Sequence, residues 1–243
     1  MPEVRFDLRF GGHTMSARIQ VPAEPIRPVD LLPVLHEFND ALIGAAVEQV
    51  ESQGRRVSCR AGCGACCRQI IAISETEARY LADLIAAMPE DRKQRVTARF
   101  TEVVEALAAS GLLERLRAEP PSDPAERNRL GLEYLRQGLA CPFLEDEGCS
   151  IHPHRPASCR EYLVTSPAEN CSTPRADNIL MVELPAKVSR VLYRFSDGEG
   201  DQPARWMALP LLLEWAAEHR EDAQPAIPGP ELFANFMNKL VKK

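Results

Sequence analysis

The sequence has no long hydrophobic run and no excess of basic residues. No segment approaches the roughly 20 consecutive apolar residues that span a bilayer. The formal net charge of −6 argues against non-specific nucleic-acid binding, which requires a basic surface. The N-terminal stretch MPEVRFDLRF alternates charged with apolar side chains and lacks the apolar block of a secretory signal. We therefore expect a cytoplasmic protein that binds neither membranes nor nucleic acids.

Common catalytic signatures are missing as well. The sequence contains no GxxxxGK[ST] or GxGxxG loop for phosphates, no HExxH helix and no GxSxG nucleophile turn. These absences leave open whether the protein is an enzyme. Its 243 residues, of which 45% are hydrophobic and 26% charged, have an ordinary globular balance, and we predict a single domain over residues 1–243.

The periodicity of the apolar residues predicts a mainly α-helical fold with a small N-terminal β-hairpin. Residues 4–10 alternate apolar with charged side chains, and a second strand-like segment comes after Gly11 and Gly12, so residues 1–22 are expected to form a hairpin extension. Residues 74–77, Ser-Glu-Thr-Glu, are typical of a capping box that begins a helix ending near Met88. Further helices are expected over 31–53, around 96–107, before Gly138, and in LPLLLEWAAEHRE and ELFANFMNKLVKK, whereas 179–195 is ambiguous between strand and helix.

Cysteine, by contrast, is abundant: the sequence holds eight, in two groups. The first group has the pattern C-x3-C-x2-C-C within CRAGCGACC, where Gly62 and Gly64 allow the backbone to turn tightly. Thiolates are strong, soft ligands for zinc and iron–sulfur clusters, so clustered cysteines in a reducing compartment more often bind metal than form disulfides. The two adjacent side chains are expected to diverge, and they can reach one polynuclear cluster or two separate centres. The members of this group are Cys59, Cys63, Cys66 and Cys67.

The second group has the looser pattern C-x7-C-x9-C-x11-C, and it lies in a segment with little periodicity. The stretch CPFLEDEGCSIHPHRPASCREY in this segment combines turn-forming residues with few core residues. A bound metal would supply the ordering free energy that so little hydrophobic surface cannot. We therefore predict an irregular, metal-tied centre within residues 55–175. The members are Cys141, Cys149, Cys159 and Cys171, and the two groups together could form two four-thiolate zinc sites or one cluster with thiols to spare.

The tandem of CRAGCGACC with CPFL…GCSIHPHRPASCREY resembles the YkgJ-type cysteine-cluster family, described as a zinc- or iron-chelating domain with a CxxCxxCC signature. The resemblance covers residues 55–175 and implies that every cysteine named above is a candidate metal ligand. The family also includes flagellin lysine N-methylases, so methyl transfer is a second implied function. The chain departs from the family pattern twice: its first gap has three residues rather than two, and His152 stands where an aromatic residue often follows the isoleucine.

Other polar residues of the second segment are weaker candidates. His152 and His154 could bind zinc through imidazole nitrogen, although two polar rings on a partly exposed loop are the favoured interpretation. Arg155, Arg160 and Tyr162 could donate hydrogen bonds to the sulfurs, or the arginines could form ordinary surface salt bridges.

The first three cysteines also match the spacing of radical S-adenosylmethionine enzymes, in which three cysteines hold a four-iron cluster. The sequence shows no alternation of strands and helices that would build the barrel of those enzymes. Ala65 stands where an aromatic residue usually precedes the last cysteine. The additional cysteines also make a three-ligand site less natural, so we do not favour this interpretation.

The favoured hypothesis is a metal-binding cysteine-cluster protein that chelates iron or zinc through all eight cysteines. An iron–sulfur cluster is slightly favoured, because the dense first loop and the Cys141-Pro142 step are more typical of cluster loops than of the separated CxxC pairs of zinc fingers. One alternative is an S-adenosylmethionine-dependent protein lysine N-methyltransferase. Another is a protein-interaction module that the metal folds.

Overall fold

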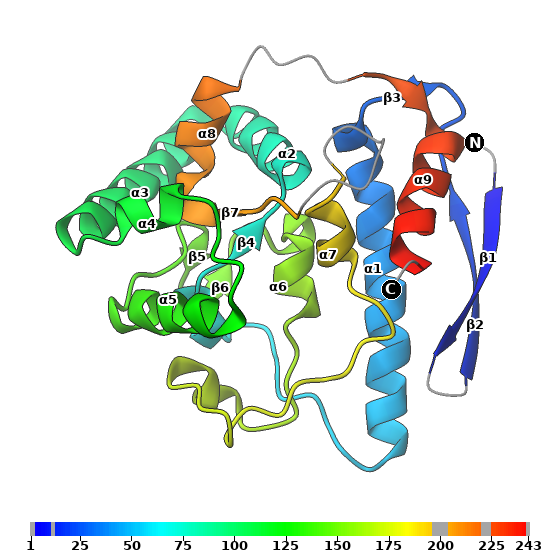
Figure 1. The fold of residues 1–243 in the computed structure, drawn as a ribbon, viewed down its shortest axis with the longest axis horizontal. Helices are drawn as coiled ribbons and strands as arrows, with labels where there is room; N and C mark the ends of the chain where they lie inside the picture. The colour runs from blue at the N-terminus through cyan, green and yellow to red at the C-terminus, as the bar shows by residue number, and fades with distance from the viewer. Residues whose placement is uncertain (1–2, 11–12, 196–203, 220–224, 242–243) are drawn as a thin grey trace.

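The computed structural model describes residues 3–10, 13–195, 204–219 and 225–241 of the chain. In this part the chain is mainly helical, with one long β-hairpin at its N-terminal end and several two-residue strands (Figure 1). The predicted mainly α fold with an N-terminal hairpin is therefore confirmed. None of the described helices is long and apolar enough to cross a bilayer.

The hairpin consists of β1 (Glu3–Phe10) and β2 (His13–Gln20), which pair in antiparallel register over their whole length. The predicted turn between them lies outside the described residues. Val4 and Ile19 are directly paired, and both contact the core that the first and last helices form. The hairpin therefore covers one side of these helices (Figure 1).

The scaffold on this side is built by α1 (Pro28–Ser52) and α9 (Gly229–Val241). Apolar residues recur every three or four positions along α1, and this periodicity gives it one continuous buried face. Phe38 on that face meets Phe233 and Phe236 of α9, with both pairs of ring centroids 6.4 Å apart in edge-to-face geometry. Two short paired strands precede the helices: β3 (Pro25–Ile26) and β8 (Ile227–Pro228).

A second group of helices lies on the other side of the molecule (Figure 1). The predicted capping box opens the first of them: the Ser74 hydroxyl accepts the Glu77 N–H at 3.2 Å, and the Glu77 carboxylate accepts the Ser74 N–H at 2.8 Å. The short helix α4 had no counterpart among the predicted elements. The group comprises α2 (Glu75–Ala86), α3 (Glu90–Ala109), α4 (Leu113–Arg117), α5 (Pro124–Arg136) and α8 (Leu212–Glu218).

Short elements occupy the space between the two groups of helices. The segment that was ambiguous in the sequence contains one helix, α7 (Val188–Leu192), and an isolated β-bridge from Met181 to Val164. Two strands, β4 (Ala72–Ile73) and β7 (Met207–Ala208), join the centre to the α2–α8 side. The remaining elements are η1 (Ala65–Arg68), β5 (Leu144–Glu145), β6 (Gly148–Cys149), η2 (His152–His154), α6 (Ala157–Glu161), η3 (Ala168–Ser172) and η4 (Leu209–Leu211).

Candidate metal centre

The two cysteine segments meet in space, although more than seventy residues separate their first members. The backbone N–H of Cys141 donates to the carbonyl of Cys67 at 2.7 Å. The Gln69 amide nitrogen donates to the carbonyl of Cys171 at 3.0 Å and contacts the Tyr162 hydroxyl at 3.3 Å. Direct hydrogen bonds therefore hold the first segment against the start and the end of the second.

The backbone of the first segment turns tightly, as its glycines predicted. Gly62 has a φ of +77°, in the left-handed region that favours glycine. A Cβ on Gly64 would lie 2.5 Å from a carboxylate oxygen of Glu147 and 2.9 Å from a methyl carbon of Leu144, so a larger residue here would require both of these side chains to move. These two positions let the loop fold back into η1 while it packs against the second segment.

The second segment contains a strained turn that faces the first cysteine loop. β5 and β6 are joined by Asp146 and Glu147, which have φ values of 49° and 58° although neither is glycine. The carboxylate of Glu147 accepts hydrogen bonds from both terminal guanidinium nitrogens of Arg68, at 2.6 and 3.1 Å. The strained turn thus places a carboxylate where it forms a two-pronged ion pair with the first loop.

Between the segments lies a cavity of about 320 Å³. Cysteines from both segments line it, together with Gln69, Arg155 and Tyr162. Cys59 is close by, because its sulfur lies 4.0 Å from the carbonyl oxygen of Tyr162. The lining cysteines are Cys63, Cys66, Cys67, Cys141, Cys149 and Cys159.

Residues 58–178 match the family model "CxxCxxCC: Putative zinc- or iron-chelating domain", which includes both cysteine segments and the cavity between them. The chain belongs to this CxxCxxCC family. The naming as YkgJ-type agrees with this match, and zinc or iron chelation is the function that the family description gives. No curated protein and no solved structure matches the chain.

The environment of the CxxCxxCC domain disfavours thiolates without a compensating positive charge. Burial raises the pKa of Cys141 to about 12, and it raises the pKa of Cys159 well above its usual value. The pKa of Cys66 is raised chiefly by a hydrogen bond with the thiol of Cys67 and then by burial. The divergence of the two adjacent side chains stays a prediction.

The donors fit a thiolate-bound metal group in kind and in their placement around one cavity. As the side chains lie, however, no three cysteine, histidine or carboxylate groups among the described residues form a set that could hold a metal ion. The thiols stand around the cavity, and they are not gathered on one point. A single tetrahedral ion would have to draw four sulfurs to about 2.3 Å from its centre.

The two histidines of the domain have different surroundings. His154 is engaged through its Nδ1, which lies 2.6 Å from the hydroxyl of Tyr80. His152 is exposed and lines the cavity, and the positive charge of Arg155, followed by desolvation, lowers its pKa. Of the two, His152 therefore remains the one that could contact a group in the cavity.

The polar neighbours of the cysteines also differ from one another. Arg155 lines the cavity, and its Nε is buried with no hydrogen-bond partner in the described part of the chain. Arg160 faces elsewhere: it is 6% exposed and binds both carboxylate oxygens of Asp40 on α1, at 2.9 and 2.7 Å. Arg160 thus joins α6 to α1 by a salt bridge, as one of its two predicted roles has it, but its guanidinium is buried and only Asp40 is exposed.

Two buried carboxylates form further hydrogen bonds between α6 and its neighbours. Glu77 accepts the N–H of Ala157 at 2.7 Å, and Glu161 accepts the N–H of Ser189 at 2.9 Å. The sequence did not single out Glu77 for this contact, nor Gln69 or Glu147 for theirs. The only sequence signal for these residues is their position near a cysteine or a capping serine, because the residues that they contact are distant in the chain.

Proposed function

We propose that the CxxCxxCC domain binds zinc or iron through the thiolates of all eight cysteines. The observation that carries this proposal is the convergence of both cysteine segments on one cavity, with six cysteines in its walls. Thiolates prefer soft and borderline metals, and a bound cation would offset the burial that disfavours ionised thiols. The group would also order a centre that consists mainly of two- to five-residue elements.

The effect of the thiols on one another's pKa supports two overlapping sets of metal-binding cysteines that share Cys66. After burial, the pKa of Cys171 is raised by its proximity to Cys66, Cys59 and Cys63. The pKa of Cys159 is raised in the same way by Cys141, Cys66 and Cys149. Cys66 is therefore within electrostatic reach of both sets, and we assign it the central place in the site.

Between the two metals, the arrangement favours an iron–sulfur cluster over single zinc ions. A cluster is wider than one ion, so its irons can meet thiols that stand around a cavity, whereas a zinc ion needs four sulfurs gathered on one point. The adjacent Cys66 and Cys67 both line the cavity, and the neighbouring Cys67 thiol is the first cause of the raised pKa of Cys66. Both residues would then serve one cluster.

Metal and sulfide analysis of anaerobically purified protein tests the proposal. We expect iron, acid-labile sulfide and a visible charge-transfer band. Stoichiometric zinc in a colourless protein would overturn the cluster and leave the thiolate site standing. Protein that takes up neither metal would overturn the site itself.

Substitution of the central cysteine tests its assigned place. Cys66→Ser should remove most of the bound metal, because both sets of thiols lose a member. Ala65→Ser is the matched control, since it adds a hydroxyl to the same loop and keeps every thiol. Full metal content in Cys66→Ser protein would show that Cys66 is not a ligand.

A further inference from the structure

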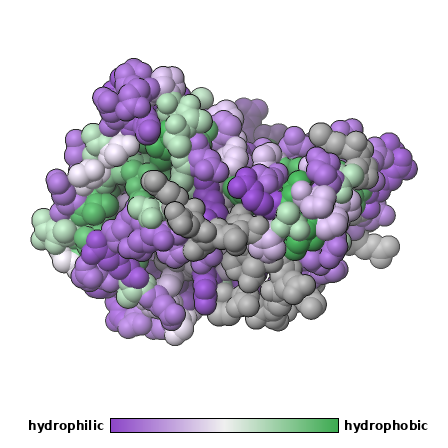
Figure 2. Space-filling model, turned by 90° about the horizontal axis from the view of Figure 1, so that it is seen from above, coloured by the Kyte–Doolittle hydropathy of each residue, from purple (hydrophilic) through white to green (hydrophobic). Residues whose placement is uncertain are grey.

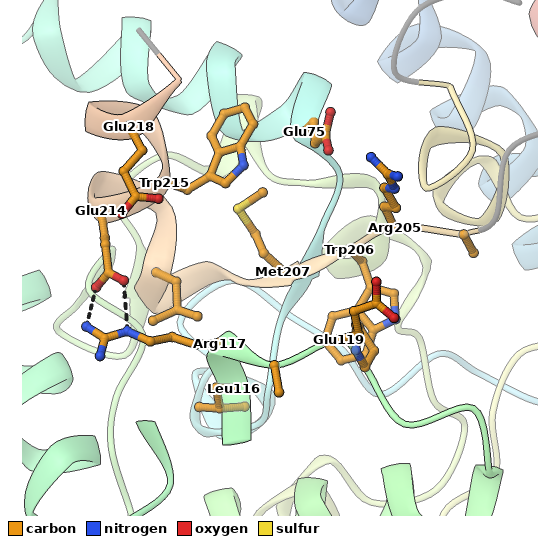
Figure 3. A pocket seen from close by; sticks show the side chains of 14 residues that line it. Glu75, Leu116, Arg117, Glu119, Arg205, Trp206, Met207, Glu214, Trp215 and Glu218 are labelled. Atoms are coloured by element: carbon orange, nitrogen blue, oxygen red, sulfur yellow. Dashed lines mark hydrogen bonds and ion pairs between the residues drawn. The ribbon is translucent and has the colours of Figure 1, made fainter. Parts of the chain in front are cut away.

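A second hollow lies on the far side of the segment Met207–Leu211 from the cysteine cavity. It has a volume of about 750 Å³, more than twice that of the cysteine cavity. Its walls come from the start of α2, the end of α4 with the residues after it, the strand β7 and the helix α8 (Figure 3). We call it the tryptophan groove, because Trp206 and Trp215 both line it and are the two tryptophans of the sequence.

One of the two tryptophans is held firmly in place. Trp215 stacks on His219 with ring centroids 4.5 Å apart and an interplanar angle of 14°, and the guanidinium of Arg79 lies 5.1 Å from its ring centroid. Trp206, at the other end of the groove, is partly exposed. Figure 3 shows Met207 between these two ends, so aromatic and apolar side chains follow the length of the groove.

The charged residues of the groove leave it net negative. Four glutamates and two arginines line it. Arg117 is neutralised, because it donates to both carboxylate oxygens of Glu214 at 2.8 Å and to Glu114 at 2.5 Å. The other three lining glutamates have no ion pair with any described residue, and Arg205 is the one remaining cation in the described wall. These glutamates are Glu75, Glu119 and Glu218.

The apolar and acidic side chains of the groove indicate the chemistry of the ligand that it can bind. Seen from above, the molecule carries hydrophobic residues in patches between hydrophilic ones (Figure 2). Carboxylates attract a cation, and the face of a tryptophan ring favours a cation and the apolar carbon attached to it. An anionic or purely apolar ligand would leave the glutamates unpaired or desolvated. The carboxylates at the ends of the groove lie apart, with Met207 between them (Figure 3), so a matching ligand must carry separated positive charges with apolar groups between them.

We propose that the tryptophan groove binds a basic, amphipathic peptide segment of a partner protein, with lysine or arginine side chains meeting Glu75, Glu119 and Glu218 and apolar side chains covering Trp206 and Met207. This site is separate from the metal centre, and the inference does not depend on which metal the CxxCxxCC domain binds. The net charge of −6 would speed the encounter with such a segment.

Tryptophan fluorescence of the full chain tests the proposal, since both reporters lie in the groove. The probe is a short peptide of leucines and lysines, and its control is the same peptide with glutamate in place of every lysine. We expect saturable binding of the first and none of the second. Equal binding of the glutamate peptide would overturn the proposal, as would equal binding of a peptide that contains only lysines, because the apolar part of the groove would then contribute nothing.

Variants locate the binding site. Replacing both Glu75 and Glu119 by Gln should weaken binding of the leucine–lysine peptide about tenfold, which is about 1.4 kcal/mol. Glu102→Gln, on the exposed face of α3 and outside the groove, should leave the affinity unchanged. An unchanged affinity in the double variant, or an equal loss in Glu102→Gln, would show that the peptide binds elsewhere or through net charge alone.

Discussion

The helical scaffold and the cysteine centre are held together by different forces. In the scaffold, α1 and α9 bury continuous apolar faces, and Phe38 sits completely buried between aromatic rings. In the centre, Phe143 and Ile151 pack into an apolar cluster with α2 and α3, but the two cysteine segments are joined to each other by ion pairs and hydrogen bonds between residues far apart in the chain. The scaffold can therefore fold on hydrophobic burial, whereas the centre needs a further source of order, which the proposed metal would supply.

The largest effect should come from the scaffold. Phe38→Ala removes a side chain with no exposed surface, and we expect it to lower the free energy of unfolding by about 3–5 kcal/mol. Urea denaturation followed by circular dichroism measures this loss. The metal content of the folded fraction should not change. A parallel loss of metal would contradict the distinction between the two regions.

An intermediate effect should appear on acidification. Burial, followed by the positive charges of Arg160 and His154, lowers the pKa of His36 to about 3, so the imidazole stays neutral in the folded chain. The unfolded chain takes up a proton below about pH 6.5, and stability is therefore lost as the pH falls. We expect His36 to account for a loss of about 2 kcal/mol between pH 7 and pH 5.

The comparison of wild-type protein with His36→Leu isolates this contribution. Burial raises the pKa of Glu77 and of Glu161, so these carboxyls act in the opposite direction: they favour the folded state at low pH and lose that contribution as the pH rises. Because both variants contain them, they cancel in the difference. Parallel stability curves for the two proteins between pH 7 and pH 5 would refute the assignment to His36.

The smallest effects should come from two similar ion pairs at the rim of the centre. Arg68–Glu147 joins the two cysteine segments, and Arg99–Glu145 joins the second segment to α3. Both pairs are partly exposed, so Glu147→Gln and Glu145→Gln should each cost less than about 1 kcal/mol. Hydrogen exchange should nevertheless rise in the first cysteine loop only for Glu147→Gln. Equal protection of that loop in both variants would show that this pair does not hold it.

Much of the scaffold could be predicted from local patterns. The apolar spacing of α1 and the capping box at Ser74 depend on neighbouring residues, and both were found as predicted. The cysteine pattern likewise indicated which segments would come together. The single-domain organisation stays a prediction.

What the sequence could not provide is the set of contacts between distant segments. The hydrogen bonds of Gln69, the ion pair of Glu147 and the clamp of Arg160 on Asp40 depend on how the elements pack, and none has a spacing or motif of its own. Local ambiguity also limited the prediction. Around Pro210 the chain forms the 3-10 turn η4 before α8 begins at Leu212, so the expected helix starts later than its apolar pattern suggested.

The segment from β7 to η4 serves as a wall for two hollows. Leu209 lines the cysteine cavity, whereas Met207 and Leu211 line the tryptophan groove. The N–H of Leu209 donates to the carbonyl of Ile71 at 2.8 Å, and this bond fixes the wall to the cysteine side. The partition is thus a single hydrogen-bonded layer, and any displacement of it would change the shape of both compartments.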